Sequence, residues 1–533
     1  MKNIKHLVLG ISCLFSFPLF SQVNIIPKPN ELTVSSNGEQ FQITAKTKIV
    51  FKDKSLESTA NFLNDYLREA YGFELTTSPV ANGKNLIILD KAKTADKTSG
   101  GYALQANKKG IFIQGNDAAG AFYGVQSLIQ LLPVQKSTTL NVPSVDIKDA
   151  PRFGYRGMML DVSRHFFSAA YVKRFIDFIA LHKMNVFHWH LTDDQGWRVE
   201  VKKHPELMSI SAFRDSTIVG HHPGKGKDGI KHGGFYTQEE IKDVVKYAND
   251  RFVEVIPEIE MPGHSQAVLA AFPNLGCTGA TFKVSETFGV HKEVLCAGND
   301  DVFTFLQEVI DEIAPLFPSK YIHVGADECP KDRWKTCEKC QKRIKDNNLK
   351  DEHELQSYFI QRMEKYINTK GKRLIGWDEI LEGGLSKTAI VMSWRGEKGG
   401  IEAAKQKNTV IMTPTTYVYF DYGQVKPDDS LVIGGFLPLD KVYGYEPIPK
   451  ELTADEAQYV LGGQANLWTE YIAYPSKAEY MLFPRMTALS EVLWSKKEQR
   501  NYDDFQKRLL TQFQRYDLWK VNYHRAWLKE YKK

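Results

Sequence analysis

The sequence lacks the features that would place the mature chain in a membrane or on a nucleic acid. Apart from one apolar run at the amino terminus, none of its 533 residues belong to an apolar stretch long enough to cross a bilayer. The formal net charge of +5 is spread over 69 Lys and Arg and 64 Asp and Glu residues, with no dense basic cluster interleaved with aromatics. We therefore expect no membrane insertion of the mature protein and no nucleic-acid partner.

Cysteine is scarce, with six in the chain. Cys277 and Cys296 flank one loop-like segment, and they could form a disulfide in an oxidising compartment. Cys337 and Cys340 form a Cys-x-x-Cys motif, with Cys329 nearby. A structural zinc site would need a second pair of soft ligands at a suitable spacing, and none follows the motif. The motif therefore favours a local disulfide or unreactive thiols over zinc.

The amino terminus has the pattern of an export signal. Lys2 and Lys5 precede the apolar run 7–20, which leads to Ser21-Gln22, a plausible small-residue cleavage point. The sequence predicts a signal peptide over 1–21 and export of the mature protein, either to the periplasm or out of the cell.

No internal repeat or low-complexity tract is evident, and 533 residues are too many for one small core. Residues 22–148 mix short alternating strands with helices at 57–71 and 118–132, and they gather no acids, histidines or tryptophans. This pattern predicts a non-catalytic α+β domain. The catalytic domain is predicted over 149–500, followed by a helical tail over 501–533 that packs on it.

In the second domain, apolar strands alternate with helix-length segments, which is typical of a parallel α/β fold. The predicted strands are 157–160, 185–190, 252–259, 321–325, 373–376, 389–393, 409–412 and 461–467. This number fits a (β/α)8 TIM barrel, in which the carboxyl ends of all strands meet on one face and carry the catalytic residues. The predicted fold class is α/β, a barrel preceded by a smaller α+β domain.

The stretch 321–328 is the most suggestive of these strand ends. A short apolar run stops abruptly at two carboxylates, Asp327 and Glu328. Neighbouring side chains on a strand point to opposite faces, so we expect the two acids to perform different tasks. A buried acidic pair in two environments can keep one carboxyl protonated and the other ionised near neutral pH.

Tryptophans mark several other strand ends. Trp377, Trp394 and Trp468 each follow a predicted strand, and acids accompany them. Aromatic walls with a few hydrogen-bonding groups suit a sugar ring, which offers C–H faces and a rim of hydroxyls. These positions predict a carbohydrate pocket.

Two classes of enzyme would use such a barrel. His188 and His190 lie on one face of a predicted strand, as do metal ligands of amidohydrolases. Those sites also need histidines from later strands, yet the fifth and sixth strands end in Trp377-Asp378-Glu379 and Trp394-Arg395. Glycoside hydrolysis instead needs a protonated carboxyl beside the glycosidic oxygen and stabilisation of an oxocarbenium-like centre. The acid pair and the aromatic walls favour this second class.

Several motifs, in this order, resemble the family 20 glycoside hydrolases, the β-N-acetylhexosaminidases. They are Arg156-Gly157 with Asp161-x-x-Arg164-His165, His188-Trp189-His190-Leu191-Thr192-Asp193-Asp194-Gln195, Met261-Pro262-Gly263-His264 and His323-Val324-Gly325-Ala326-Asp327-Glu328. The resemblance spans residues 151–494, and the amino-terminal module is similar to the family's non-catalytic domain. One departure is Ala326, where the family usually has a second glycine. We expect a slight adjustment of the strand end there, without loss of activity.

The resemblance implies substrate-assisted catalysis, in which the sugar's 2-acetamido oxygen attacks the anomeric carbon and no enzyme nucleophile is needed. It makes Glu328 the general acid and then the base, Asp327 the partner of the acetamido N–H, and Tyr419 a donor to the acetamido oxygen. Asp193 or Asp194, together with His264, would steer Glu328, and the residues alone leave the choice of aspartate open. The implied substrate-binding residues are Arg156, Asp161, Trp377, Trp394, Asp421, Trp468 and Glu470. Neither a cofactor nor a metal is implied.

The predicted function is an exo-acting, retaining β-N-acetylhexosaminidase that removes terminal GlcNAc or GalNAc from a glycan or chito-oligosaccharide. The alternatives are a relative that releases a disaccharide such as lacto-N-biose, one that acts mainly on chitobiose, or a non-catalytic sugar-binding barrel. The presence of both Asp327 and Glu328 argues against the non-catalytic alternative. A roomier pocket near Arg156, Asp421 and Glu470 would favour the disaccharide. The sequence leaves the oligomeric state open.

Overall fold

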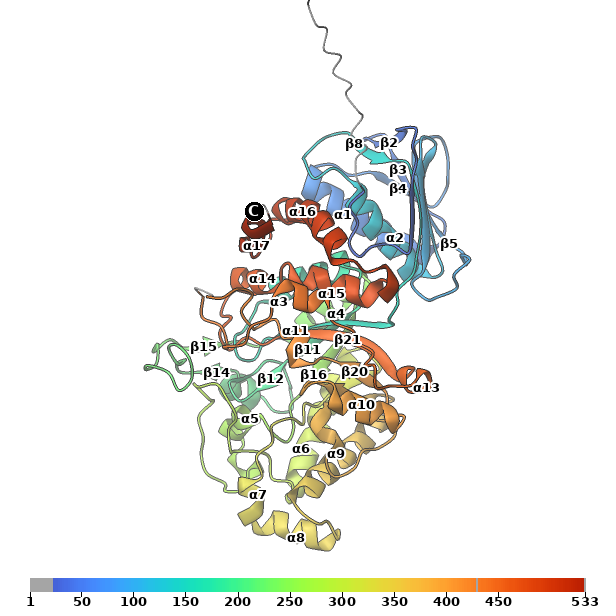
Figure 1. Ribbon diagram of the computed structural model, residues 1–533. Helices are drawn as coiled ribbons and strands as arrows, with labels where there is room; N and C mark the ends of the chain where they lie inside the picture. The colour runs from blue at the N-terminus through green and yellow to red at the C-terminus, as the bar shows by residue number, and fades with distance from the viewer. Residues whose placement is uncertain (1–22, 428–429, 532–533) are drawn as a thin grey trace, which may run out of the picture.

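The computed structural model describes residues 23–427 and 430–531, so the predicted signal peptide lies outside the described residues. Figure 1 shows a sheet with two helices above a larger barrel, and α16 (Tyr502–Leu518) lies between these two parts. Among the described residues, no helix combines the length and the apolar character needed to cross a membrane.

The amino-terminal domain is a seven-stranded mixed sheet with the strand order β1-β9-β6-β7-β5-β3-β4. Its strands are β1 (Glu31–Val34), β3 (Lys48–Phe51), β4 (Thr76–Ser78), β5 (Leu86–Lys91), β6 (Tyr102–Asn107), β7 (Gly110–Gly115) and β9 (Val145–Asp149), and β2 (Gln40–Ile43) pairs separately with β8 (Leu140–Pro143). The helices α1 (Glu57–Tyr71) and α2 (Ala118–Leu131) match the predicted ones. The Asp117 side chain begins α2 by accepting a hydrogen bond from the Gly120 N–H at 2.8 Å.

The second domain is a closed barrel of parallel strands, which confirms the predicted fold class. In order around the barrel they are β10 (Tyr155–Asp161), β11 (Val186–His190), β16 (Glu254–Glu258), β17 (Tyr321–His323), β18 (Arg373–Trp377), β19 (Ile390–Ser393), β20 (Val410–Met412) and β21 (Val460–Leu467), with β21 paired back to β10. Side chains are buried on both faces of β10, β11 and β19. Burial on both faces explains why these strands are continuous apolar runs in the sequence.

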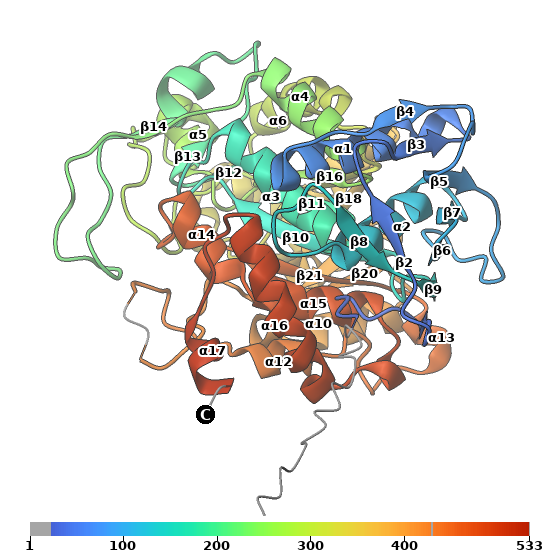
Figure 2. The same cartoon turned by 90° about the horizontal axis from the view of Figure 1, so that it is seen from above.

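Helices surround the barrel when it is seen from above (Figure 2). They are α3 (Ala169–Leu181), α4 (Gln238–Asn249), α5 (Gln266–Ala271), α6 (Asp300–Ile313), α7 (Asp332–Thr336), α8 (Glu338–Asp346), α9 (Glu352–Thr369), α10 (Lys398–Lys405), α11 (Thr415–Val418), α12 (Leu439–Tyr443), α13 (Ala454–Ala457), α14 (Pro475–Leu482), α15 (Arg485–Trp494) and, after α16, α17 (Ala526–Tyr531). The helix α16 contacts both domains, because Arg515 Nη2 donates to the Gln130 carbonyl of the amino-terminal domain and Arg508 Nη1 to Glu491 Oε2 of α15, both at 2.7 Å.

Arg156 lies at the amino-terminal start of β10, away from the strand ends that converge on the opposite face of the barrel. Its guanidinium donates to the carbonyls of Lys183 and Phe153 at 2.8 and 2.7 Å, and to the Tyr123 hydroxyl at 3.0 Å. It also stacks over the Trp494 ring and is 2% exposed. The prediction that Arg156 binds substrate is therefore wrong, because its side chain joins the barrel to the amino-terminal domain.

The disulfide predicted between Cys277 and Cys296 is also absent. Every cysteine in the part of the chain that the structure describes is a free thiol, so Cys337 and Cys340 form no disulfide either. Cys277, Cys296, Cys337 and Cys340 instead converge on one point beside the barrel. The second pair of soft ligands that a zinc site would need therefore precedes the Cys-x-x-Cys motif in the sequence.

Candidate active site

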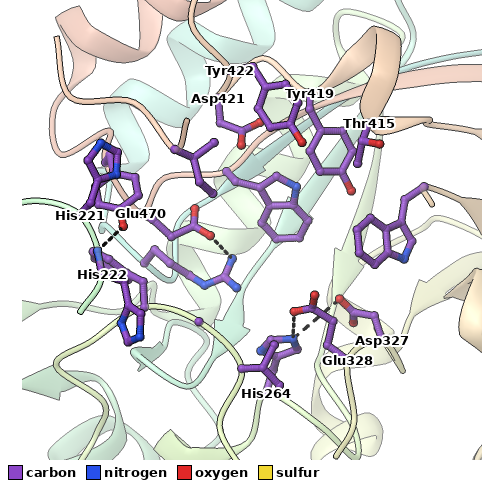
Figure 3. A pocket seen from close by; sticks show the side chains of 18 of the residues that line it. His221, His222, His264, Asp327, Glu328, Thr415, Tyr419, Asp421, Tyr422 and Glu470 are labelled. Atoms are coloured by element: carbon purple, nitrogen blue, oxygen red, sulfur yellow. Dashed lines mark hydrogen bonds and ion pairs between the residues drawn. The ribbon is translucent and has the colours of Figure 1, made fainter. Parts of the chain in front are cut away.

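A cavity of about 460 Å³ opens at the carboxyl ends of the barrel strands. Predicted residues that line it are His264, Asp327, Glu328, Trp377, Trp394, Tyr419, Asp421, Trp468 and Glu470. Figure 3 shows the two acids beside His264 at one end, with Asp421 and Glu470 across the cavity. The structure therefore brings together most of the residues that the sequence singled out.

The backbone turns sharply between β17 and the acid pair. The strand ends at His323, and Gly325, Ala326 and Glu328 have φ angles of 63°, 70° and 45°. Left-handed backbone at Ala326 and Glu328 costs each residue on the order of 1–2 kcal/mol. The expectation that Asp327 and Glu328 point to opposite faces of a strand is wrong, because neither belongs to the strand and both line the same cavity.

Gly325 permits this turn for a second reason. A Cβ atom there would overlap the Glu260 carboxyl group, so only glycine leaves room for that acid beneath the turn. Glu260 is buried, and neither of its oxygens has a hydrogen-bond partner among the described residues. Burial, followed by the nearby Asp327 and Glu258, raises the pKa of Glu260 well above its usual range. Glu260 is therefore a neutral acid below the pair.

His264 lies between two groups of acids. Its Nδ1 is 3.1 Å from Asp194 Oδ2 and 3.3 Å from Asp193 Oδ1, so both aspartates contact it and Asp194 is the nearer. Its Nε2 is 3.6 Å from Glu328 Oε2 and 3.8 Å from Asp327 Oδ2. Burial opposes a charge on the ring, but Asp193 and the other acids outweigh it and raise the pKa of His264 well above its usual range. The ring is therefore an imidazolium that faces the acid pair.

The two pocket acids have opposite pKa shifts. Burial raises the pKa of Asp327 to about 7, against the attraction of His264. The close ion pair with His264 lowers the pKa of Glu328, against partial burial. In this geometry a proton held by the pair therefore resides on Asp327. The two acids do lie in different environments, as the sequence predicted. The proton, however, is on Asp327, whereas a general acid at Glu328 needs it on Glu328.

Arg164 occupies the cavity in the place expected of Arg156. Its Nε donates to Gln195 Oε1 at 3.0 Å, and its Nη1 and Nη2 lie 3.2 and 2.9 Å from Asp161 Oδ2 and Asp193 Oδ2. The guanidinium lies 5.0 Å from the centre of the Trp468 ring. The sequence contained the signal, because Arg164 follows the carboxyl end of β10 whereas Arg156 starts that strand.

Asp161 supports this arginine and does not line the cavity. It is fully buried, and besides Arg164 its carboxylate accepts hydrogen bonds from the backbone N–H groups of Ser163 and Thr469 at 2.8 and 3.0 Å. Because the side chain is fully buried and does not line the cavity, the carboxylate cannot reach a sugar bound there. The prediction that Asp161 contacts substrate is therefore wrong, and its contacts position Arg164.

Buried carboxyl oxygens without partners face the cavity opposite the acid pair. Neither oxygen of Asp421, nor Oε2 of Glu470, accepts a hydrogen bond from any described residue. Burial, then the charge of Glu470, raises the pKa of Asp421 well above its usual range. Arg164 Nη1 lies 3.9 Å from Glu470 Oε1 (Figure 3). Unpaired buried acceptors are costly, so this end of the cavity is built for a ligand that supplies hydroxyl donors.

Aromatic rings form the floor and wall of the cavity. Trp377 and Trp468 lie 5.9 Å apart, and Trp394 stacks on Tyr419 at 6.3 Å. Indole N–H groups fix the orientation of two of them: Trp377 Nε1 donates to Glu258 and Trp394 Nε1 to Glu379, both at 2.9 Å. These rings offer apolar faces to the C–H groups of a pyranose.

Comparison with known proteins identifies the family. The model of the glycosyl hydrolase family 20 catalytic domain matches residues 153–497, and that of the family's domain 2 matches residues 22–150. The chain belongs to glycosyl hydrolase family 20. A beta-hexosaminidase of Porphyromonas gingivalis is 47% identical over 98% of this chain and 69% of its own length, and one of Vibrio furnissii is 37% identical over 88% and 76%.

Solved structures of family 20 proteins share the fold. An exo beta-N-acetylglucosaminidase from Vibrio harveyi, in complex with N-acetylglucosamine, superposes with a TM-score of 0.83 at 34% identity, covering 94% of this chain and 78% of that chain. A beta-N-acetylhexosaminidase from Streptomyces coelicolor gives a TM-score of 0.81 at 30% identity, covering 94% and 97%. The amino-terminal domain therefore occurs with the barrel in these relatives, and the chain is a glycoside hydrolase.

The His188 and His190 pair belongs to a buried network below the pocket of this glycoside hydrolase. Glu258 is at its centre, and its carboxylate lies 2.9 Å from His188 Nε2, 2.6 Å from His190 Nδ1 and 2.8 Å from His323 Nδ1. Burial opposes protonation of His190, but Glu258 and Asp193 outweigh it and raise the pKa of His190 to about 10. Neither histidine lines the cavity, and the chain belongs to a glycoside hydrolase family, so the amidohydrolase alternative is wrong.

Loops supply the part of the cavity that the sequence interpretation missed. His221 and His222 lie on one side of the cavity (Figure 3), and Tyr471 and Phe288 also line it. The ring of Phe288 is 5.6 Å from that of Tyr471 and 6.0 Å from that of His165. His221, His222 and Phe288 follow no barrel strand directly, so the rule that selects strand ends could not find them.

Proposed function

We propose that this family 20 enzyme is an exo-acting, retaining β-N-acetylhexosaminidase that removes terminal non-reducing GlcNAc or GalNAc from glycans. The observation that carries the proposal is the adjacent pair Asp327 and Glu328, both facing one cavity and both within 4 Å of His264 Nε2. Two acids on the same side of a sugar suit one proton donor and one partner for the acetamido group. The names of the relatives support the same activity.

Substrate binding would move the proton from Asp327, which holds it in the free protein, to Glu328. The acetamido N–H donates to Asp327, and a donor to a carboxylate lowers its pKa from the resting value of about 7. Once ionised, Asp327 repels a charge on Glu328, which raises the pKa of Glu328. A substrate with a 2-acetamido group thus moves the proton to the residue that must deliver it.

Glu328 then gives its proton to the glycosidic oxygen while the acetamido oxygen bonds to the anomeric carbon and the aglycone leaves. The product is an oxazolinium ion, whose positive charge faces the ionised Asp327 and whose oxygen accepts from Tyr419. In the second step Glu328 removes a proton from water, and the water oxygen bonds to the anomeric carbon as the oxazolinium ring opens. Two inversions give retention of configuration.

Exo action would follow from the opposite end of the cavity. Arg164 and Asp421 are buried there, Glu470 is partly buried, and the three offer hydrogen-bonding groups to the hydroxyls of the terminal sugar. A chain that continued beyond that sugar would leave these groups desolvated and without partners, which costs about 1–3 kcal/mol for each.

The decisive experiment compares a chromogenic β-GlcNAc with the matched β-glucoside. We expect turnover of the first only, because the glucoside lacks the internal nucleophile. Glu328→Gln and Asp327→Asn should each lower kcat by about 10²–10⁴-fold on the β-GlcNAc. The control is Glu382→Gln, which removes a carboxylate outside the cavity whose side chain is 42% exposed. Equal turnover of both sugars, or full activity of Glu328→Gln, would overturn the proposal.

We further propose that the protein is exported after removal of residues 1–21. The basic and apolar pattern before Ser21-Gln22 supports this. The test is cell fractionation and amino-terminal sequencing of the full chain expressed in its source, with a variant lacking residues 2–20 as the control. The expected first residue is Gln22, and a cytoplasmic chain that retains residues 1–21 would contradict export.

A further inference from the structure

Four cysteine side chains converge outside the active site. Cys277 and Cys296 come from the two ends of one long loop, and Cys337 and Cys340 come from the start of α8. Their sulfur atoms all lie within 4.8 Å of one another. Cys296, Cys337 and Cys340 are buried, and Cys277 is partly exposed, which leaves a route of entry from solvent.

The distances between the sulfurs have the size of a tetrahedral metal site. Cys277 Sγ is 3.8 Å from Cys340 Sγ, and Cys296 Sγ is 3.7 and 3.6 Å from those of Cys337 and Cys340. Four thiolates bound to zinc at about 2.3 Å lie about 3.8 Å from one another, whereas sulfurs in a disulfide are about 2.0 Å apart. The cluster is therefore nearly the right size for zinc without movement.

We propose that Cys277, Cys296, Cys337 and Cys340 bind one structural zinc ion. Four protein ligands leave no open position for water or substrate, so the site takes no part in hydrolysis. Binding converts the four thiols to thiolates and releases their protons.

The backbone around the cluster is shaped as a closed site requires. A Cβ atom at Gly298 would overlap the backbone of Lys339 and Cys340, so only glycine lets the segment after Cys296 approach the start of α8. Arg343 Nη2, from α8, donates to the Gly298 carbonyl at 3.2 Å and holds this segment against the helix.

The zinc ion would hold one wall of the sugar pocket in place. The loop between Cys277 and Cys296 carries Phe288 to the cavity. Its middle is bonded to the catalytic segment, because the Ser285 N–H donates to the Asp194 carbonyl at 2.9 Å and Gln195 Nε2 to the Thr287 carbonyl at 3.0 Å. The metal fixes the two ends of this loop to α8.

The first experiment measures zinc and thiols in the full chain, purified without chelator or reductant. We expect about one zinc per chain by plasma mass spectrometry, with the four cluster thiols reacting with dithionitrobenzoate only after denaturation and release of the metal. A pair of disulfides, seen as a mass lower by four hydrogens and no zinc, would overturn the proposal. So would four free thiols that bind no added zinc.

The second experiment uses a matched pair of substitutions. Cys296→Ser should lose nearly all the zinc and lower the Tm, whereas Cys329→Ser, which removes a buried thiol outside the cluster, should keep about one zinc per chain. Equal zinc content in the two variants would contradict the assignment. If Cys296→Ser fails to fold, wild-type chain produced with cobalt decides the question: tetrahedral cobalt thiolate absorbs strongly in the visible, and absence of that absorption would exclude the site.

Discussion

Asp327 is the residue at which the stability and the proposed chemistry of the pocket oppose each other. Burial holds its pKa at about 7, well above the ordinary value of 3.8, because it disfavours the charged carboxylate. The proposed reaction nevertheless needs Asp327 ionised beside the acetamido group. Enzymes commonly lose some folding stability in this way, because residues arranged for the reaction are unfavourably placed until substrate binds.

This conflict predicts a pH dependence of stability. A raised folded pKa means that Asp327 contributes stability below its unfolded pKa and that this contribution is lost as pH rises through about 7. Asp327→Asn lacks the ionisation, so its free energy of unfolding should exceed that of the wild type increasingly from pH 4 to pH 8, by at most about 4 kcal/mol. Urea unfolding at several pH values measures the difference. Parallel pH profiles would contradict the assignment of the proton to Asp327.

Arg156, at the start of β10, and Arg164, after the carboxyl end of β10, allow a direct comparison. Arg164→Lys should lower kcat/KM roughly 100-fold, because an ammonium cannot replace the guanidinium that binds Asp161, Asp193 and Gln195. We expect the lost hydrogen bonds to cost about 2–3 kcal/mol. Arg156→Lys should keep kcat/KM within about twofold and lower the Tm, since Arg156 joins the two domains. Steady-state kinetics and thermal unfolding of both variants test this. A loss of kcat/KM in Arg156→Lys at an unchanged Tm would restore the original prediction.

At the scale of elements, the sequence predicted what local patterns determine. All eight barrel strands were placed within a few residues, because strands buried on both faces are continuous apolar runs. The strand ends then selected most of the cavity residues. Arg156 was expected to bind substrate although it lies at the start of its strand, and the left-handed turn at Ala326 and Glu328 left no signal in strand periodicity.

The positions of loop residues cannot be predicted from local sequence patterns, for a physical reason. Their positions follow from contacts between distant segments, and nothing in local periodicity reports those contacts. Cys277 and Cys296 meet Cys337 and Cys340 only because the loop and α8 fold against each other. His221, His222 and Phe288 reach the cavity in the same way.

The loop between Cys277 and Cys296 provides a prediction at this scale. Phe288→Ala should raise KM about tenfold, equivalent to about 1.4 kcal/mol, and leave kcat nearly unchanged, because the ring lines the cavity but has no group that takes part in the proposed proton transfers. Steady-state kinetics on a chromogenic β-GlcNAc measures both constants. Phe282→Ala, in the same loop but outside the cavity lining, is the matched control. A fall in kcat with unchanged KM would show that Phe288 acts on the reacting groups.

At the scale of the whole molecule, one buried ion pair joins the domains. Asp149, at the end of β9, accepts from Lys183 Nζ and Trp494 Nε1 of the barrel domain, both at 3.0 Å, and from Tyr102 in its own domain at 2.8 Å. The side chains of Asp149 and Lys183 are fully buried. Because these contacts cross the interface, the two domains should unfold together.

Removing one partner of this pair tests that coupling. Asp149→Ala leaves the Lys183 ammonium buried without its counter-charge, which should lower the free energy of unfolding by about 3–5 kcal/mol. Asp90→Ala removes an acid from a surface pair with Lys52, at 2.8 Å, and should cost less than about 1 kcal/mol. We expect denaturant unfolding of Asp149→Ala to stay a single transition at lower denaturant, with kcat/KM of the folded enzyme unchanged, since Asp149 lies outside the sugar pocket. Two separate transitions in the wild type would show that the interface does not couple the domains.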